Sequence, residues 1–279
     1  MVKLYKMPEL PEIETIKRGI KSLEGQTILG VVIRNPNLRY LVDQNLNKIL
    51  KNLCVYHIAR RAKYLMFNLN QTNSTVHGYL IIHLGMSGRL ELTKNNQPLK
   101  KHDHVDILFA DGTILRYNDP RRFGCIIYEK NLENNTLLAH LGPEPLEAEF
   151  NTKYLAGKLN NKSGTIKQLI MDNKIVVGVG NIYACEALFL AKISPLRSGK
   201  SLNQTEIKLL VKCIKQVLEK AIELGGSSIS DYKQADGSLG YFQNVHNVYG
   251  RAGKECHICK TAILEKRIGQ RNSFFCTTC

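Results

Sequence analysis

Apolar positions change their spacing along the chain, and each spacing predicts a different secondary structure. Between residues 11 and 23 they recur every three or four positions, so they line one face of a helix. Pro11 suits the first turn of this helix, Glu12 suits its positive dipole end, and Gly25 suits its stop. The chain is therefore predicted to begin with an amphipathic helix over residues 11–23.

From Thr27 to about Lys130 the pattern changes to short runs rich in β-branched and aromatic residues, which are typical of strands. Asp111 and Gly112 favour a tight hairpin between two of the runs. Because a sheet must bury one face against a second layer, this region is predicted to form a β-sandwich or flattened barrel that carries the first helix. The predicted strands are residues 28–33, 54–58, 64–69, 79–84, 105–109, 113–117 and 125–128.

The second half of the chain is predicted to be mainly helical. Residues 131–150 are rich in Asn and Glu and end in a Gly-Pro-Glu-Pro run, which indicates a linker. Asn203 with Glu206 resembles a capping box, and the long amphipathic helix that follows ends at Gly225. The Gly- and Ser-rich residues 225–240 predict a mobile loop. Two shorter helices are expected at residues 166–171 and 182–190.

Composition narrows the class of partner. The chain has 279 residues, 43% of them hydrophobic, which is enough for about two globular domains. No apolar run approaches the roughly 20 residues of a membrane helix. The 39 lysines and arginines exceed the 24 acidic residues, and the formal charge of +15 favours nucleic acid or an anionic membrane. Without an amphipathic basic anchor we expect nucleic acid; a merely basic soluble protein is the alternative.

The carboxyl terminus carries two Cys-x-x-Cys pairs separated by sixteen residues. This spacing is typical of a zinc site with four thiolates, which leave no open position for catalysis, so one structural Zn²⁺ is predicted. Two disulfides are the alternative, but they need an oxidising compartment, and nothing resembles a signal peptide. The predicted ligands are Cys256, Cys259, Cys276 and Cys279. The isolated Cys54, Cys125, Cys185 and Cys213 are expected to be reduced core residues of a cytosolic protein.

The segment Met7-Pro8-Glu9-Leu10-Pro11-Glu12 could supply a nucleophile. If translation starts at Met7 and that methionine is removed, Pro8 carries a secondary amine with a pKa of roughly 8, partly neutral near neutral pH. Such an amine can attack a sugar aldehyde carbon and give an iminium that withdraws electrons. Glu9 beside it could move protons. The alternative, and the default without other observations, is that this segment only begins a helix.

Blocks spread over the whole chain together resemble one family. Residues 8–15, PELPEIET, are similar to the start of the formamidopyrimidine-DNA glycosylases, and the resemblance extends from Met7 to Cys279. The other matching blocks are residues 60–65, 83–88, 101–105, 119–124, 141–146, 171–173 and 177–184, and the cysteine ribbon with Gln270 and Arg271.

The resemblance implies a base-excision repair enzyme, a DNA glycosylase and abasic-site lyase, that excises 8-oxoguanine and formamidopyrimidines from duplex DNA. By resemblance, Pro8 attacks the sugar C1′ to form a Schiff base, and Glu9 donates the proton that opens the sugar. Lys63 matches the lysine assigned to β-elimination, and Arg271 matches the zinc-finger arginine assigned to δ-elimination. Both would place positive charge beside a departing phosphate. Taken alone, either residue would be a solvated surface charge.

The resemblance also implies how the DNA is held. A base extruded from the stack leaves a void, and Met86, Arg121 and Phe123 match the family residues that fill it. His102 and Arg121 match other DNA contacts, and Asn181 lies in the turn of a helix-two-turn-helix motif that approaches a phosphate. Without the resemblance, Met86 and Phe123 would be interpreted as core residues and His102 as structural.

Pattern and resemblance together predict an α+β, multidomain fold. The predicted parts are an extension absent from the mature protein (1–6), a catalytic β-sandwich domain with a leading helix (7–136), a linker (137–150), a helical helix-two-turn-helix domain with the lesion loop (151–248) and a four-cysteine zinc finger (249–279). We expect a cytoplasmic monomer, nucleoid-associated when bound to DNA, with no membrane partner. Its expected partner is double-stranded DNA that contains oxidised purines or abasic sites.

The chain departs from the family pattern at two places. If residues 1–6 are retained, the Pro8 nitrogen is an amide and cannot form the iminium, so we expect translation to start at Met7 or, second, proteolytic trimming. The family's basic cluster is sparser here, and Lys162 or Lys167 is the candidate to replace its DNA contact.

Two other functions compete with this interpretation. An endonuclease VIII-type glycosylase would prefer oxidised pyrimidines, but Leu10, Arg121 and Phe123 favour the purine branch. A non-catalytic protein that binds damaged DNA would share the charge, the zinc and the helix-turn features, and it is the expected function if residues 1–6 are retained.

Overall fold

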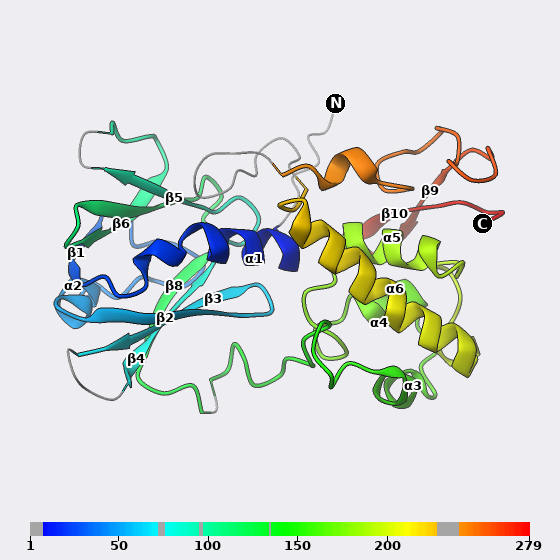
Figure 1. Ribbon diagram of the computed structural model, residues 1–279, viewed down its shortest axis with the longest axis horizontal. Helices are drawn as coiled ribbons and strands as arrows, with labels where there is room; N and C mark the ends of the chain where they lie inside the picture. Colours follow the sequence, from blue (N-terminus) through cyan, green and yellow to red (C-terminus); the bar gives the residue numbers. More distant parts are fainter. Residues whose placement is uncertain (1–7, 72–75, 95–96, 134, 228–239) are drawn as a thin grey trace. The chain divides into compact units, whose positions relative to one another are not determined.

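The computed structural model describes residues 8–71, 76–94, 97–133, 135–227 and 240–279 (Figure 1). The predicted extension and residues 228–239 of the predicted mobile loop lie outside these ranges. The described chain forms two compact units. The first contains Pro8, Glu12–Ala139 and the described residues of Gly225–Gly240, and the second contains Glu9–Pro11, His140–Leu224 and Tyr241–Cys279.

The first helix, α1, spans Leu10–Gly19 and is followed by a short 3₁₀ turn, η1, at Lys21–Leu23. Its apolar stripe is buried as predicted, from Ile13 to Leu23, and joins the core of the first unit. The α-helix ends earlier than expected, at Gly19, a residue type that weakens helices. The rest of the predicted helix forms the separate 3₁₀ turn. Gly25, at φ +85°, then reverses the chain.

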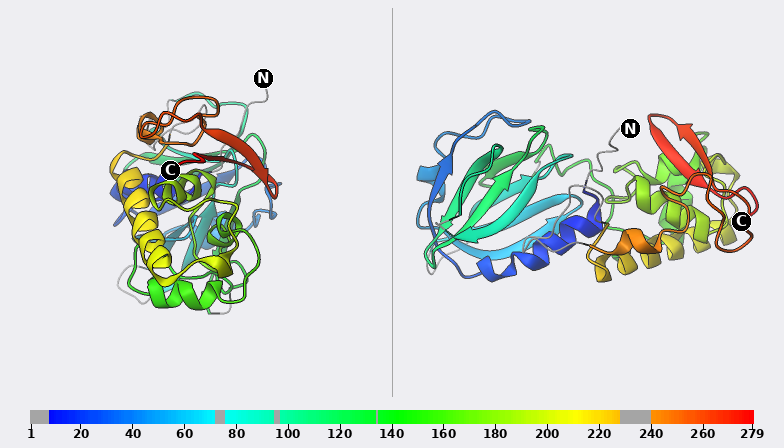
Figure 2. Two further views of the ribbon diagram at one scale, coloured as in Figure 1. Left: turned by 90° about the vertical axis from the view of Figure 1, so that its right-hand side faces the viewer. Right: turned by 90° about the horizontal axis from the view of Figure 1, so that it is seen from above.

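Two antiparallel four-stranded sheets form the layers of a sandwich in the first unit (Figures 1 and 2). Apolar residues on their facing sides, together with the α1 stripe, make one continuous core, which confirms the predicted sandwich. The first sheet has the order β1 (Ile28–Ile33), β6 (Asp103–Phe109), β7 (Thr113–Asn118), β5 (Arg89–Lys94). The second has the order β2 (Cys54–Arg61), β3 (Tyr64–Asn70), β4 (Val76–His83), β8 (Cys125–Glu129).

All seven predicted strands are present, and the described part of the sandwich contains one further strand, β5, that was not predicted. Its sequence, RLELTK, reads as polar because β5 lies at the edge of its sheet and turns only one face to the core. Leu90 on that face is buried, and Leu92 packs against the same core. The short helix α2 (Leu46–Leu50) was also missed, since five residues carry too little periodicity to detect.

The second unit contains four helices in its described part: α3 (Thr152–Leu159), α4 (Ile166–Ile170), α5 (Asn181–Leu190) and α6 (Gln204–Glu223). The capping box at the start of α6 is confirmed, because the Asn203 side chain accepts from the Glu206 N–H and the Glu206 carboxylate accepts from the Asn203 N–H. Helix α5 is buried on every side and forms the centre of the core. Helix α3 was not predicted. None of the helices in the described ranges combines the length and hydropathy of a membrane crossing.

The cysteine-containing segment includes a two-stranded antiparallel ribbon, β9 (Leu264–Ile268) and β10 (Arg271–Phe275). Gly269, at φ +59°, makes the tight turn between the strands. Ile263 and Phe274 are buried in the same core as α5, so the ribbon is attached to the helical unit and is not an independent module. The predicted α+β architecture, with its sandwich, helical part and cysteine finger, is confirmed.

Candidate nucleic-acid interface and metal centre

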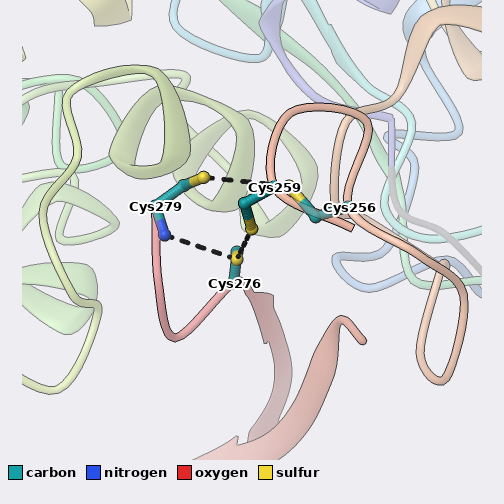
Figure 3. A group of neighbouring side chains, drawn as sticks. All are labelled: Cys256, Cys259, Cys276 and Cys279. Carbon is teal, nitrogen blue, oxygen red and sulfur yellow. Dashed lines mark hydrogen bonds between the residues drawn. The ribbon is translucent and has the colours of Figure 1, made fainter. Parts of the chain in front are cut away.

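Four cysteines from two distant segments converge at the base of the ribbon (Figure 3). Their sulfur atoms all lie within 4.8 Å of one another. The Sγ atoms of Cys259 and Cys276 are 3.4 Å apart, and those of Cys256 and Cys279 are 4.0 Å apart. All eight cysteines of the chain lie in the described ranges, and none forms a disulfide. This arrangement can hold one metal ion.

The amino-terminal motif packs against the glycine turn that begins α5. Glu9 is 5% exposed, and its Oε1 accepts a hydrogen bond of 3.3 Å from the N–H of Ile182, in the first turn of α5. The N–H of Leu10 donates to the carbonyl of Gly178. A carboxylate is favoured at a helix amino terminus because the exposed N–H groups and the helix dipole are positive there. The two sequence blocks are therefore joined through Glu9.

Two glycines make this packing possible. A Cβ atom at Gly180 would lie 2.0 Å from Cδ of Glu9, and one at Gly178 would lie 2.5 Å from Cδ1 of Leu10. Gly178 also adopts φ +77°, which favours glycine. The structure shows that their missing side chains make room for the amino-terminal motif.

A buried ammonium group links α4, α5 and the ribbon. Lys167 is 1% exposed, and its Nζ donates to Oδ1 of Asn181 at 2.5 Å and to Oγ of Ser273 at 2.6 Å. Nδ2 of Asn181 donates to the carbonyl of Asn272 at 2.9 Å. Burial lowers the pKa of Lys167, and the charge of Arg271 lowers it further, whereas the charge of Glu9 raises it. Asn181 is thus held in place from two sides.

Arg271 begins β10 and is exposed, directly before the two ribbon residues that contact Asn181 and Lys167. The charges of Glu9 and Arg271 both influence the pKa of Lys167. These two predicted catalytic residues therefore lie near Lys167 and its partner Asn181. Lys162, the other basic residue considered as a DNA contact, is exposed, whereas Lys167 points inward.

A second buried group in this unit escaped sequence reasoning. Glu186, on α5, is 1% exposed, and its carboxylate accepts four hydrogen bonds of 2.9 Å. The donors are the backbone N–H groups of Asn247, Val248 and Tyr249 and the side chain of Asn247. This carboxylate fixes the segment that leads into the cysteine finger. A glutamate inside an apolar helix was the available signal, because such a charge is rarely buried without partners.

In the first unit, the predicted void-filling residues lie on two adjacent loops. Met86 and Phe123 line a cavity of about 540 Å³, together with Arg39, His83, Gly85 and Arg122. The guanidinium of Arg121 lies 4.6 Å from the centre of the Phe123 ring. Phe123 is 47% exposed, which argues against the core interpretation of this aromatic side chain. The structure therefore brings Met86, Arg121 and Phe123 together.

His83 lines this cavity and was not singled out by the sequence. Its Nδ1 accepts a 3.0 Å hydrogen bond from the N–H of Gly85. Burial, and then the charges of Lys63 and Arg39, lower the pKa of His83 from 6.5 to about 4, so the ring is neutral at physiological pH. Lys63 lies near His83, in the turn between β2 and β3, immediately after Ala62 at φ +54°.

His102 lies beside the same loops. Its carbonyl accepts from the N–H of Asp119, and its ring centre is 6.2 Å from that of His104. Pro8 is buried and directly precedes Glu9. Each unit thus holds its own group of predicted residues: Lys63, Met86, His102, Arg121 and Phe123 in the first, and Glu9, Asn181 and Arg271 in the second.

The sandwich, the helical unit and the four-cysteine finger, with acidic and basic side chains gathered beside α5, define a DNA glycosylase and abasic-site lyase. The model of the formamidopyrimidine-DNA glycosylase N-terminal domain matches residues 7–126, and that of the formamidopyrimidine-DNA glycosylase H2TH domain matches residues 141–233. The chain belongs to the formamidopyrimidine-DNA glycosylase family.

Individual relatives agree with this assignment over nearly the whole chain. The formamidopyrimidine-DNA glycosylase of Aliivibrio fischeri is 50% identical over 274 residues, which are 98% of each protein. A solved structure of a Lactococcus lactis FPG mutant with Fapy-dG-containing DNA has a TM-score of 0.88 at 36% identity and covers 98% of this chain and 99% of that one. Another, of wild-type Lactococcus lactis FPG with DNA containing an oxidised pyrimidine, has a TM-score of 0.87 at the same identity and coverage.

Proposed function

We propose that this protein excises oxidised purines, 8-oxoguanine and formamidopyrimidines, from duplex DNA and then cuts the strand by β,δ-elimination. The observation that carries the proposal is the position of Glu9, a nearly buried carboxylate fixed at the start of α5, next to Pro8. The complex of a relative with Fapy-dG-containing DNA supports the substrate class.

The proposed chemistry begins at the nitrogen of Pro8. Its lone pair attacks C1′ of the damaged nucleotide, the bond from C1′ to the base breaks, and the base leaves with the proton that the amine nitrogen gives up. Glu9 donates a proton to the ring oxygen, which opens the sugar and leaves an iminium between Pro8 and C1′. A secondary amine gives an iminium that carries a permanent positive charge. This mechanism requires a free Pro8 nitrogen, so the peptide bond between Met7 and Pro8 must be absent.

The iminium then drives the two elimination steps. It acidifies the C2′ proton, whose removal expels the 3′ phosphate, and a second elimination expels the 5′ phosphate. We assign Lys63 to the first step and Arg271 to the second, because positive charge stabilises a departing phosphate. The exposed position of Arg271 beside Asn181 supports this assignment. Water finally hydrolyses the iminium and regenerates the amine.

The remaining predicted residues bind the DNA. We propose that Met86, Arg121 and Phe123 enter the void left by the extruded base, as their gathering on adjacent loops favours. His102 and Asn181 contact phosphates. Asn181 is preorganised for this role, since Lys167 and the ribbon already fix its side chain.

We propose Zn²⁺ as the ion of the cysteine cluster. A tetrahedral ion with Zn–S bonds of about 2.3 Å separates its sulfur atoms by roughly 3.8 Å, which the Sγ pairs at 3.4 and 4.0 Å fit. Cys256, Cys259, Cys276 and Cys279 would hold it, and with four thiolate ligands it would supply folding stability to the ribbon that carries Arg271. We further propose that the protein acts as a cytoplasmic monomer that associates with the nucleoid.

Borohydride trapping followed by peptide mapping tests this function. A protein that begins at Pro8 should form a covalent adduct with abasic DNA, mapped to the Pro8 nitrogen. The matched control retains residues 1–7 and should give no adduct, because its Pro8 nitrogen is an amide. An adduct on a lysine, with Pro8 untouched, would refute the mechanism. No adduct from either form would favour the non-catalytic binding protein.

An oxidised-pyrimidine activity is the second candidate, since a relative has been solved with oxidised-pyrimidine DNA. Excision from 8-oxoguanine and thymine-glycol duplexes, compared under single-turnover conditions, separates the two substrate classes. We expect faster release of 8-oxoguanine. The reverse order would assign the protein to endonuclease VIII-type specificity.

A further inference from the structure

The end of strand β7 carries a fully buried carboxylate, that of Asp119, which is 0% exposed. Oδ1 accepts from the Ser87 hydroxyl at 2.5 Å and from the Arg121 N–H at 3.2 Å. Oδ2 accepts from the Gly124 N–H at 2.9 Å and from the Tyr117 hydroxyl at 3.1 Å. Both oxygens therefore have two donors each, and three of the four donors belong to loops rather than to the sheet.

Those loops carry the residues assigned to base extrusion. We call residues 84–88 and 119–124 the wedge loops, because Met86 lies on the first and Arg121 and Phe123 lie on the second. Their backbones are in direct contact: a Cβ atom at Gly85 would lie 2.5 Å from the carbonyl carbon of Phe123. Asp119 bonds to both loops at once and so sets the position of one relative to the other.

The second wedge loop does not adopt its shape from local preference alone. Arg122 has φ +58°, a left-handed conformation that non-glycine residues seldom occupy. Such conformations persist when surrounding contacts impose them. Here the Asp119 carbonyl accepts two hydrogen bonds. One comes from the Arg122 N–H, at 3.2 Å, and the other from Nε2 of His104, at 2.8 Å. Asp119 thus fixes the loop through its backbone as well as through its side chain.

We propose that Asp119 is a positioning residue for base extrusion, which acts by holding Met86, Arg121 and Phe123 in the arrangement that fills the vacated stack. The inference rests on the proposed function, because it presumes that the wedge loops enter DNA. Asp119 itself is fully buried, so its side chain is not available to contact DNA. Its role is to keep two loops rigid where a displaced side chain would leave the void open.

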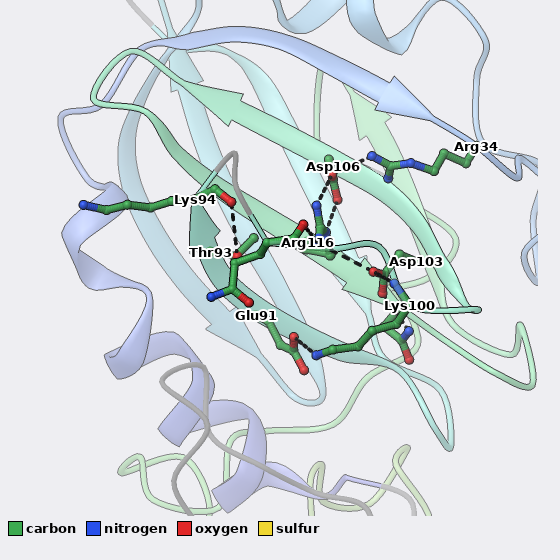
Figure 4. A network of polar contacts seen from close by, with 10 residues as sticks. Arg34, Glu91, Thr93, Lys94, Lys100, Asp103, Asp106 and Arg116 are labelled. Carbon is green, nitrogen blue, oxygen red and sulfur yellow. Dashed lines mark hydrogen bonds and ion pairs between the residues drawn. The ribbon is translucent and has the colours of Figure 1, made fainter.

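A buried carboxylate of the same sheet provides the matched control. Asp106, 2% exposed on β6, accepts from Arg116 at 2.9 Å through both oxygens and from Arg34 at 2.7 Å (Figure 4). Arg116 lies on β7 and Arg34 directly follows β1, so this ion pair joins strands and contacts neither wedge loop. Asp106→Asn therefore disturbs a buried carboxylate of the sandwich without disturbing the wedge.

Asp119→Asn is the informative substitution because it keeps the shape of the side chain. An amide has one oxygen and one NH₂ group. Whichever way it turns, the NH₂ group faces a backbone N–H that the carboxylate now accepts, that of Arg121 or that of Gly124. Ser87→Ala is the second variant, and it leaves the Asp119 carboxylate in place. It removes the hydroxyl that donates to Asp119 and that accepts from the Arg121 N–H.

The experiment compares two substrates, with each protein beginning at Pro8. The first is a duplex with 8-oxoguanine, where the base must be extruded and the stack filled. The second is a single strand with a preformed abasic site, which has no stack to fill, and borohydride trapping reports the chemistry on it. We expect Asp119→Asn to slow excision from the duplex by about a hundredfold, the loss that a misplacement of about 1 Å far from the chemistry can cause, and to leave single-strand trapping at the wild-type level. Ser87→Ala should show the same selectivity with a smaller loss.

The outcomes separate the possible explanations. Equal losses on both substrates by Asp119→Asn, or a selective loss by Asp106→Asn, would mean that buried carboxylates only maintain the fold, and would overturn the inference. Wild-type excision by Asp119→Asn would overturn it as well. Selective loss of duplex excision by the Asp119 and Ser87 variants, but not by Asp106→Asn, supports it. A wild-type protein inactive on both substrates would instead refute the proposed function on which the inference rests.

Discussion

Replacing Gly180 by alanine should separate catalysis from stability. An added Cβ atom would lie 2.0 Å from Cδ of Glu9 and 2.3 Å from its Oε1. Non-bonded carbon atoms sit comfortably at roughly 3.5–4.0 Å, so the Glu9 carboxylate must move away by about 1.5 Å. A misplacement of about 1 Å can cost about a hundredfold in rate, equivalent to about 2.7 kcal/mol of activation free energy. We therefore expect excision to slow by at least this factor.

The fold should tolerate the same substitution. Gly180 has φ −97°, which alanine adopts readily, and the group that must move is the end of a flexible side chain. The cost in unfolding free energy is then the hydrogen bond from the Ile182 N–H, about 1 kcal/mol. Gly157→Ala, on α3, is the control, because an added Cβ atom there meets nothing within 4 Å.

Single-turnover release of 8-oxoguanine, with enzyme in excess, measures the chemical step, and urea unfolding measures stability. Wild-type excision by Gly180→Ala would show that the Glu9 position is not needed for base release, and would remove the observation on which the proposed function rests. A collapse of stability as large as the loss of activity would show that the two effects were not separated, against the reasoning from the flexible side chain.

Three other predictions concern pH, metal and salt. Folding lowers the pKa of His83 from 6.5 to about 4, so the unfolded chain binds more protons than the folded one between these pH values. The free energy of unfolding, measured by urea denaturation, should therefore fall by about 2 kcal/mol from pH 7 to pH 5. His83→Asn, which keeps an acceptor for the Gly85 N–H, should lack this contribution; an unchanged pH slope would contradict the assignment. Cys259→Ser should lose the metal and weaken DNA binding, since three thiolates hold the ribbon poorly; full zinc content by atomic absorption would count against it. Duplex affinity, measured by fluorescence anisotropy, should drop steeply with added salt through counterion release, and a flat response would argue against an interface dominated by phosphate contacts.

Secondary structure was predictable where periodicity was long and the local signals agreed. The α1 stripe, the Asp111-Gly112 hairpin and the α6 capping box each depend on residues close in sequence, and each is present in the structure. The edge strand β5 was missed because one of its faces is polar. Helix α3 was missed because it is only eight residues long and weakly apolar on average.

The residues of the candidate site also fall into those that the sequence could predict and those that it could not. Sequence motifs pointed to Glu9 and Arg271, but not to the groups that hold the site in place. Lys167 contacts Ser273 across 106 positions of sequence, and Ser87 contacts Asp119 across 32, and no local pattern encodes such pairs. Buried charges inside apolar segments, as at Glu186, were the one visible trace of them.

The four hydrogen bonds to Glu186 have a consequence for metal loss. They secure the backbone at residues 247–249, upstream of Cys256, by contacts that do not involve sulfur. Chelation should therefore loosen the chain around the four cysteines, while Glu186 still holds the backbone at residues 247–249 against α5. Since these contacts need no metal, fresh metal should restore the finger after chelation, so loss of the ion would silence the protein reversibly rather than destroy it.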